Sequence, residues 1–247
     1  MVNIRLNRET RPLLMNRIHL TLCHSLCILV LVFSSKLVAV EPIRVVLEFT
    51  PDLDNGRRSF EICARCHLPE AWGNDDGTYP QIAGQHVNVL MKQLLDIRSG
   101  RRDNPSMQPF VQERTIGGYQ NLSDVVAYIS TLPMNPAHNR GPWPEDSAEF
   151  ESGKRLYRQH CSNCHGQSGE GNNELSYPRL QGQHYNYMKR QARLARDRLR
   201  RVEPVMASLF TTLSEQDFDQ VLNYVSHLAV PVSDLAPDTA WRNPDFK

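Results

Sequence analysis

The sequence of 247 residues contains a long internal repeat, and this repeat limits the folds that the chain can adopt. The motif Cys-x-x-Cys-His occurs at residues 63–67 and again at residues 161–165, an offset of 98. Two further motifs recur at offsets of 98 and 99, Tyr-Pro-x-x-x-Gly-Gln-His (79–86 and 177–184) and Pro-x-Met (105–107 and 204–206). Self-similarity at a fixed offset indicates one structural unit used twice, so the sequence predicts two lobes of about 100 residues each.

The two copies predict a domain boundary near the middle of the chain. Residues 136–146 are too rich in proline for helix or sheet and indicate a linker. We therefore expect a first lobe at residues 41–135 and a second lobe at residues 147–247, the second ending in a C-terminal tail.

The hydrophobic pattern of both copies predicts an all-α fold, because alternating strand patterns are scarce. One helix is expected to run into each cysteine motif, at residues 54–64 and 147–161. A second helix is expected after each Gly-Gln-His, through about Arg98 and Arg201. Serine is a favourable N-cap, so the last helix of each copy is expected to begin at Ser123 or Ser214.

The first 40 residues have the order of a secretory signal, with basic residues, an apolar run from about Ile18 to Phe33 and then small residues. The apolar run is short and interrupted, so a cleaved signal is favoured over an uncleaved anchor that would hold the protein at the membrane. A lipid anchor on Cys23 or Cys27 is disfavoured, because neither cysteine follows a small-residue lipobox. The segment predicts export to the periplasm.

Charge and composition exclude one class of partner. Residues 41–247 hold 23 basic and 26 acidic residues, so this part of the chain is slightly acidic. Nucleic-acid-binding proteins normally have a strong basic excess, so no nucleic-acid partner is expected.

The Cys-x-x-Cys-His motif is the attachment sequence of a c-type haem. Its two thiols each add to one haem vinyl group, and its histidine supplies the proximal nitrogen to the iron. We therefore expect two covalently attached haems c, bound through Cys63, Cys66 and His67 in the first lobe and Cys161, Cys164 and His165 in the second.

Other uses of paired cysteines explain these two motifs less well. Zinc-binding Cys-x-x-Cys pairs usually lie about 15–20 residues apart, whereas 94 residues separate Cys66 from Cys161. A thioredoxin-like redox pair needs a βαβ pattern, which the sequence lacks. Disulfides are plausible in an exported protein but leave the histidine of both copies unexplained.

The repeated Pro-x-Met predicts the sixth iron ligand. Met107 lies 40 residues beyond His67, and Met206 lies 41 residues beyond His165, whereas the other methionines have no counterpart in the opposite copy. Methionine ligation closes the iron and suits it to electron transfer. The duplicated His86 and His184 are the competing ligands, although a surface position or a contact with a haem propionate is the favoured role for them.

Pro80 and Pro178 each lie 13 residues after a proximal histidine. A metal-bound histidine generally donates its other ring N–H to a carbonyl or carboxylate, and each proline carbonyl could accept that bond. The alternative is that each proline only forms a turn.

The order of these motifs, present twice, resembles the diheme class I cytochromes c of the cytochrome c4 family, over roughly residues 50–230. The resemblance implies two tandem class I lobes about a pseudo-twofold axis, with the two haems close enough for rapid transfer. It places His67 and Met107 on one iron, and His165 and Met206 on the other. The sequence departs from the family in an insertion between Met107 and Leu122 and in the tail beyond Val230.

The resemblance implies a periplasmic shuttle that moves electrons between a membrane or periplasmic donor and a terminal oxidase or reductase. The alternative is the cytochrome subunit of a periplasmic dehydrogenase complex, such as a sulfide or alcohol dehydrogenase. A diheme peroxidase is disfavoured, because a methionine ligand in both lobes leaves no open iron. We therefore expect redox partner proteins, no small-molecule substrate and no enzymatic activity.

A basic run distinguishes the second copy from the first. Residues 189–201 hold seven basic residues and one acid. On a continuous helix, positions 189, 193, 196 and 200 would share one face. Such a patch would steer an acidic redox partner to the second lobe, although a solvated helix face is the simpler interpretation.

Overall fold

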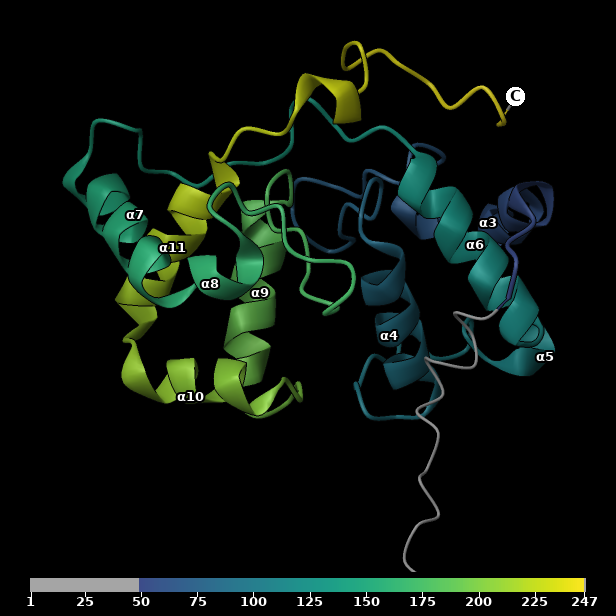
Figure 1. Ribbon diagram of the computed structural model, residues 1–247, viewed down its shortest axis with the longest axis horizontal. Helices are drawn as coiled ribbons and strands as arrows, with labels where there is room; N and C mark the ends of the chain where they lie inside the picture. Colours follow the sequence, from purple (N-terminus) through teal and green to yellow (C-terminus); the bar gives the residue numbers. More distant parts are fainter. Residues whose placement is uncertain (1–48, 247) are drawn as a thin grey trace, which may run out of the picture. The chain divides into compact units, whose positions relative to one another are not determined.

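The computed structural model describes residues 49–246, which belong to one compact unit, Glu41–Lys247. The predicted signal segment, residues 1–40, lies outside the described residues. The described part forms helices and two isolated β-bridges but no strand, which confirms the all-α prediction (Figure 1). No helix in this part is both long enough and apolar enough to cross a bilayer.

The first lobe has three main helices and one short helix, α3 (Leu53–His67), α4 (Val87–Arg98), α5 (Glu113–Ile116) and α6 (Tyr119–Thr131). Helices α3 and α4 both pack against α6 around a core that includes Phe60, Met91 and Leu122. The α3–α6 crossing is close at Gly56, where a Cβ atom would overlap the backbone carbonyl of Asp124. A glycine is therefore required at this crossing.

The second lobe repeats this arrangement with α7 (Ala148–His160), α8 (Ser162–His165), α9 (Tyr185–Arg196), α10 (Pro204–Thr212) and α11 (Glu215–Ser226). Helices α7 and α9 pack against α11, and Gly153 repeats the role of Gly56 at the α7–α11 crossing. A separate apolar cluster holds α10 in place, with the rings of Phe210 and Phe218 stacked 4.5 Å apart.

Two of the predicted helix starts are confirmed. Ser147 caps α7 by accepting a hydrogen bond from the Phe150 amide at 3.1 Å. Ser214 caps α11 in a reciprocal capping box with Asp217.

The predicted start at Ser123 is wrong, because α6 begins at Tyr119 and Ser123 is buried inside it. Gly117 adopts a left-handed conformation with φ 89°, so the chain turns there and the helix begins earlier. Helix α3 likewise begins before the expected position, after its N-cap Asp52. Helix α9 ends at Arg196 rather than near Arg201, and the chain turns at Arg198, which has φ 59°.

The linker packs on the second lobe. The Nε2 atom of His138 donates to the Ser226 carbonyl at 2.9 Å, and the Trp143 amide donates to Asn223 Oδ1 at 2.9 Å. Both acceptors belong to α11, so the proline-rich segment is held along that helix.

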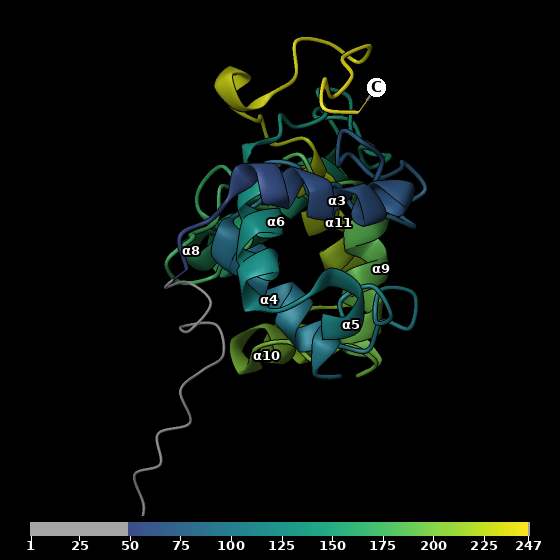
Figure 2. The same ribbon diagram turned by 90° about the vertical axis from the view of Figure 1, so that its right-hand side faces the viewer.

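The C-terminal tail leaves the second lobe and packs on the first. After the 3₁₀ helix Val232–Asp234, it runs over the first lobe in both ribbon views (Figures 1 and 2). The ring centroids of Trp241 and Trp72 lie 5.8 Å apart, as do those of Phe246 and Phe60. The tail therefore completes the first lobe's core, together with Ala236.

We expect Trp241→Ala to lower the free energy of unfolding by about 2 kcal/mol, because it removes a half-buried indole from the first lobe's core. Urea unfolding of the haem-loaded protein measures this change. The control is Arg242→Gln, which alters an exposed side chain 4.0 Å from Glu70 and so should change stability little. Equal stabilities of the two variants would contradict the role given to the tail.

Candidate functional site

The two cysteine motifs lie at the ends of equivalent helices. Cys63 and Cys66 belong to the last turn of α3, while Cys161 caps the end of α7 and Cys164 lies in α8. None of the four forms a disulfide, and all are partly buried. Burial raises the pKa of Cys63 to about 12 and that of Cys161 to about 11. A redox-active Cys-x-x-Cys needs a lowered thiol pKa, so this environment disfavours the thioredoxin interpretation.

The two proximal histidines are buried and oriented alike. His67 is 4% exposed and His165 is 7% exposed. The Nδ1 atom of His67 donates to the Pro80 carbonyl at 3.0 Å, and that of His165 donates to the Pro178 carbonyl at 3.1 Å. Burial lowers the pKa of both rings, more than the proline carbonyls raise it, which keeps the imidazoles neutral at pH 7. A neutral ring with a bonded Nδ1–H presents Nε2 as a metal ligand.

One glycine in each lobe lets the loop that carries the proline return to the histidine. These glycines were not predicted from the sequence. The Gly73 amide donates to the His67 carbonyl at 3.0 Å, and the Gly171 amide donates to the His165 carbonyl at 2.8 Å. Both glycines have positive φ, and a Cβ atom on either would overlap the carbonyl of Tyr79 or Tyr177. The offset of 98 between Gly73 and Gly171 was the signal that could have identified them.

The predicted sixth ligands lie beyond α4 and α9. Met107 is partly buried in a turn that its amide closes onto the Asn104 carbonyl at 3.1 Å. Met206 lies in α10 and packs at the edge of the cluster around Phe210. Cysteine, histidine and proline are thus brought together in each lobe, and each methionine occupies the segment before the last helix.

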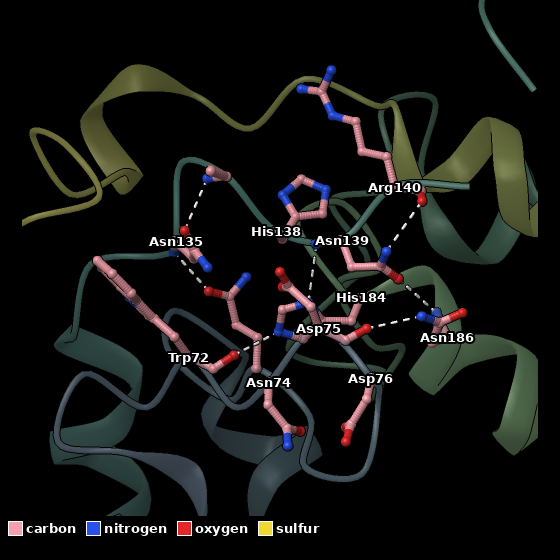
Figure 3. Close-up of polar contacts among 12 residues, drawn as sticks. Trp72, Asn74, Asp75, Asp76, Asn135, His138, Asn139, Arg140, His184 and Asn186 are labelled. Carbon is pink, nitrogen blue, oxygen red and sulfur yellow. Dashed lines mark hydrogen bonds and ion pairs between the residues drawn. The ribbon is translucent and has the colours of Figure 1, made fainter. Parts of the chain in front are cut away.

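The duplicated histidines of Gly-Gln-His join the lobes. The Nε2 atom of His86 donates to the Glu170 carbonyl at 2.8 Å, and that of His184 donates to the Trp72 carbonyl at 2.7 Å. His184 also accepts the Asn139 amide through Nδ1 at 3.1 Å, so both of its ring nitrogens are engaged (Figure 3). This arrangement disfavours His184 as an iron ligand.

Two partly buried arginines from opposite lobes share the same acceptors. Arg102 donates to Gln93 Oε1 at 2.6 Å and to Gln191 Oε1 at 3.1 Å. Arg200, at the same place in the repeat, donates to these oxygens at 3.5 and 2.9 Å. Arg102 also donates to the hydroxyl of Tyr187 at 3.1 Å, so each of these acceptors is neutral.

This arginine pair fits the charge of haem. Arg200 Nε is buried without a hydrogen-bond partner among the described residues. Burial, and next the charge of Arg102, lower the pKa of Arg200 to about 10. The Asp96 carboxylate opposes this shift. Partly buried like charges are costly unless anions accompany them, and a haem would bring two propionate carboxylates. The residues present therefore suit haem in their donor atoms and in their charge.

The zinc interpretation finds no support in residues 49–246, where no three histidine, cysteine, aspartate or glutamate side chains gather into a metal site.

Comparison with known proteins identifies the family. The family model for cytochrome c matches residues 150–229. A cytochrome c4 of Thiocapsa roseopersicina is 32% identical over 180 residues, which cover 68% of this chain and 88% of that protein. The chain belongs to the cytochrome c4 family. As a cytochrome c4-type protein it is a diheme electron-transfer cytochrome with two haems c.

Two further matches agree with this family. The crystal structure of reduced cytochrome c4 from Pseudomonas stutzeri superposes with a TM-score of 0.62 at 26% identity, covering 73% of this chain and 100% of that one. A thiosulfate dehydrogenase electron acceptor of Stutzerimonas stutzeri is 30% identical over 176 residues, covering 67% of this chain and 78% of that protein. This chain is thus also similar to a protein named for accepting electrons from a dehydrogenase.

We expect two haems per chain by mass spectrometry of denatured protein, because thioether bonds survive unfolding. Replacing Cys161 and Cys164 with Ser should leave one haem, on the first lobe. Two haems retained in this variant would contradict the attachment sites.

We expect Met107→Leu or Met206→Leu to open one iron each, which lowers that haem's reduction potential and admits carbon monoxide. Visible spectroscopy with and without carbon monoxide measures this. The matched control is Met188→Leu, since Met188 is buried in the second lobe's core and has no counterpart in the first lobe. Full carbon monoxide resistance in both ligand variants would show that other residues hold the irons.

Proposed function

We propose that this chain is a periplasmic electron carrier that shuttles electrons between a membrane or periplasmic donor and a terminal oxidase or reductase. Residues 1–40 would export it, with the first lobe at residues 41–135, the linker at 136–146 and the second lobe at 147–247. The supporting observation is the pair of matched proximal sites, His67 with Pro80 and His165 with Pro178, within one compact unit. Two such sites suit the transfer of an electron from one haem to the other and its delivery to a partner protein. The chain is proposed to catalyse no reaction of its own.

Each residue type has a separate task in this proposal. Bound haem supplies a one-electron iron couple in each lobe. Cys63, Cys66, Cys161 and Cys164 would hold the two groups covalently, and His67 and His165 would ligate the irons through Nε2. The Pro80 and Pro178 carbonyls would fix the rings, and Met107 and Met206 would supply the second protein ligand of each iron.

The second lobe offers a surface for a partner, but a smaller one than the sequence predicted. Of the four positions expected on one face, Lys189 pairs with Asp219 at 2.6 Å, and Arg196 donates to the Leu213 carbonyl at 3.3 Å. Arg200 is partly buried between the lobes, because α9 ends before it. Arg193 is the most exposed of the four, with 78% of its side chain accessible, and it lies 3.8 Å from the Asp197 carboxylate.

Exposed cations and exposed apolar side chains occur together in residues 193–205, along with the exposed acids Asp197 and Glu203. Leu199 is 62% exposed and Val205 is 68% exposed, next to the proposed ligand Met206. Arg193, Arg198 and Arg201 are exposed around this segment. A basic rim around an exposed apolar centre suits brief docking of an acidic redox partner.

The second candidate is the electron-accepting subunit of a periplasmic dehydrogenase. The similarity to a thiosulfate dehydrogenase electron acceptor favours it. Purification of the native protein from its own membranes and periplasm separates the candidates, because a subunit would copurify with a catalytic chain in fixed ratio. A chain recovered alone, and reoxidised by membranes that contain oxidase, would support the shuttle.

We expect the double variant Arg193→Gln, Arg198→Gln to slow association with the physiological partner about three- to tenfold at low salt and to flatten the salt dependence. Stopped-flow reoxidation at several ionic strengths measures both effects. The matched control is Arg155→Gln, Arg158→Gln, which removes the same charge from exposed positions of α7 in the same lobe. Equal rates for the two variants would remove this surface from the proposal.

A further inference from the structure

The glutamine of each Gly-Gln-His motif pairs with the backbone of the opposite lobe. Gln183 Oε1 accepts the Gln81 amide at 3.1 Å, and its Nε2 donates to the Gln81 carbonyl at 2.7 Å. Gln85 Oε1 accepts the Arg179 amide at 3.0 Å, and its Nε2 donates to the Arg179 carbonyl at 2.9 Å. Each side-chain amide thus engages both backbone groups of one residue in the other lobe.

The orientation of each side-chain amide is fixed by a third bond. Gln183 Oε1 also accepts the amide of His184 at 3.1 Å, and Gln85 Oε1 accepts the amide of His86 at 3.0 Å. An oxygen between two N–H donors cannot exchange with the NH₂ group without losing both bonds. Both glutamines are therefore held in one state.

Each glutamine binds the residue that directly follows the proline whose carbonyl accepts the histidine bond. The peptide that links Pro80 to Gln81 accepts the His67 Nδ1–H at its carbonyl and donates its N–H to Gln183. The peptide that links Pro178 to Arg179 accepts the His165 Nδ1–H and donates to Gln85. One peptide unit thus separates the proximal histidine of each lobe from the glutamine of the other.

We propose that Gln183 and Gln85 are positioning residues, each of which sets the reduction potential of the haem in the opposite lobe. The proposal rests on His67 and His165 being the proximal ligands. Hydrogen bonds in series polarise one another, so a bond accepted from a peptide N–H makes the carbonyl of that peptide a stronger acceptor. A stronger acceptor draws the histidine Nδ1–H further, makes the imidazole a more basic ligand and favours ferric iron.

This series of hydrogen bonds fixes the direction in which each reduction potential should change. Removing Gln183 weakens the Pro80 carbonyl as an acceptor, so the haem on His67 becomes easier to reduce. Removing Gln85 does the same to the haem on His165. A glutamine that only fastens the lobes together would not produce this crossed pattern.

The test is spectroscopic redox titration of the haem-loaded chain with Gln183→Leu and with Gln85→Leu. We expect each variant to raise the reduction equilibrium constant of the opposite haem about three- to tenfold, the range of one lost hydrogen bond. A tenfold change corresponds to 59 mV for one electron. The haem of the variant's own lobe should change by less than about twofold.

The matched control is Asn186→Ala, which removes another bond across the same boundary, from Asn186 Nδ2 to the Asp75 carbonyl at 2.9 Å. This residue contacts neither proximal peptide, so we expect both potentials to stay unchanged. Should the Leu variants fail to fold, Gln183→Glu keeps the size and the acceptor of the side chain. Its negative charge should make the His67 haem harder to reduce, opposite to Gln183→Leu.

Each haem is identified by repeating the titrations in a Met206→His background, which separates the second haem by its lower potential. Failure of that substitution to move one haem would overturn the axial-ligand assignment, whatever the glutamines do. With the assignment intact, a Gln183→Leu shift on the second-lobe haem, on both haems alike, or on neither overturns the proposal.

Discussion

The hydrogen bond from a buried histidine to a proline carbonyl is the interaction around which each lobe is organised. It requires a helix that ends at the histidine, a loop that returns 13 residues later, and a glycine that lets this loop approach the helix end. The helices α3 and α7 are in turn fixed by their glycine crossings with α6 and α11. Because the imidazole is buried and its Nδ1 is engaged, Nε2 is the ring atom left to bind a metal, which is the role we propose for it.

Duplication explains why the boundary between the lobes is self-complementary. When two copies of one unit meet about a pseudo-twofold axis, a residue that contacts its partner surface does so twice, with roles exchanged. Gln85 and Gln183, His86 and His184, and Arg102 and Arg200 each form such reciprocal bonds. A bond that benefits one lobe is thus obtained for both.

The sequence predicted those features whose chemistry is local. The five residues of Cys-x-x-Cys-His are enough to predict the cofactor. The offset of 98 predicted the two lobes and the proline that accepts a bond from each histidine. The interlobe role of Gly-Gln-His could not be predicted, because its acceptors lie 84–112 residues away and are backbone atoms without a sequence signature. The prediction of a basic face on residues 189–200 was wrong for a different reason. The prediction assumed that α9 continues to Arg201. The helix ends at Arg196 and the chain turns at Arg198, so Arg200 lies between the lobes.

The C-terminal tail has a consequence for the order in which the chain matures. Its aromatic residues belong to the core of the first lobe, although they are synthesised after the helices of the second lobe. Domains of a growing chain generally fold in order from the N-terminus. Here the first lobe emerges first but cannot complete its core until residues 236–246 arrive. The lobe that carries the attachment motif at residues 63–67 therefore begins to fold early and completes its core late.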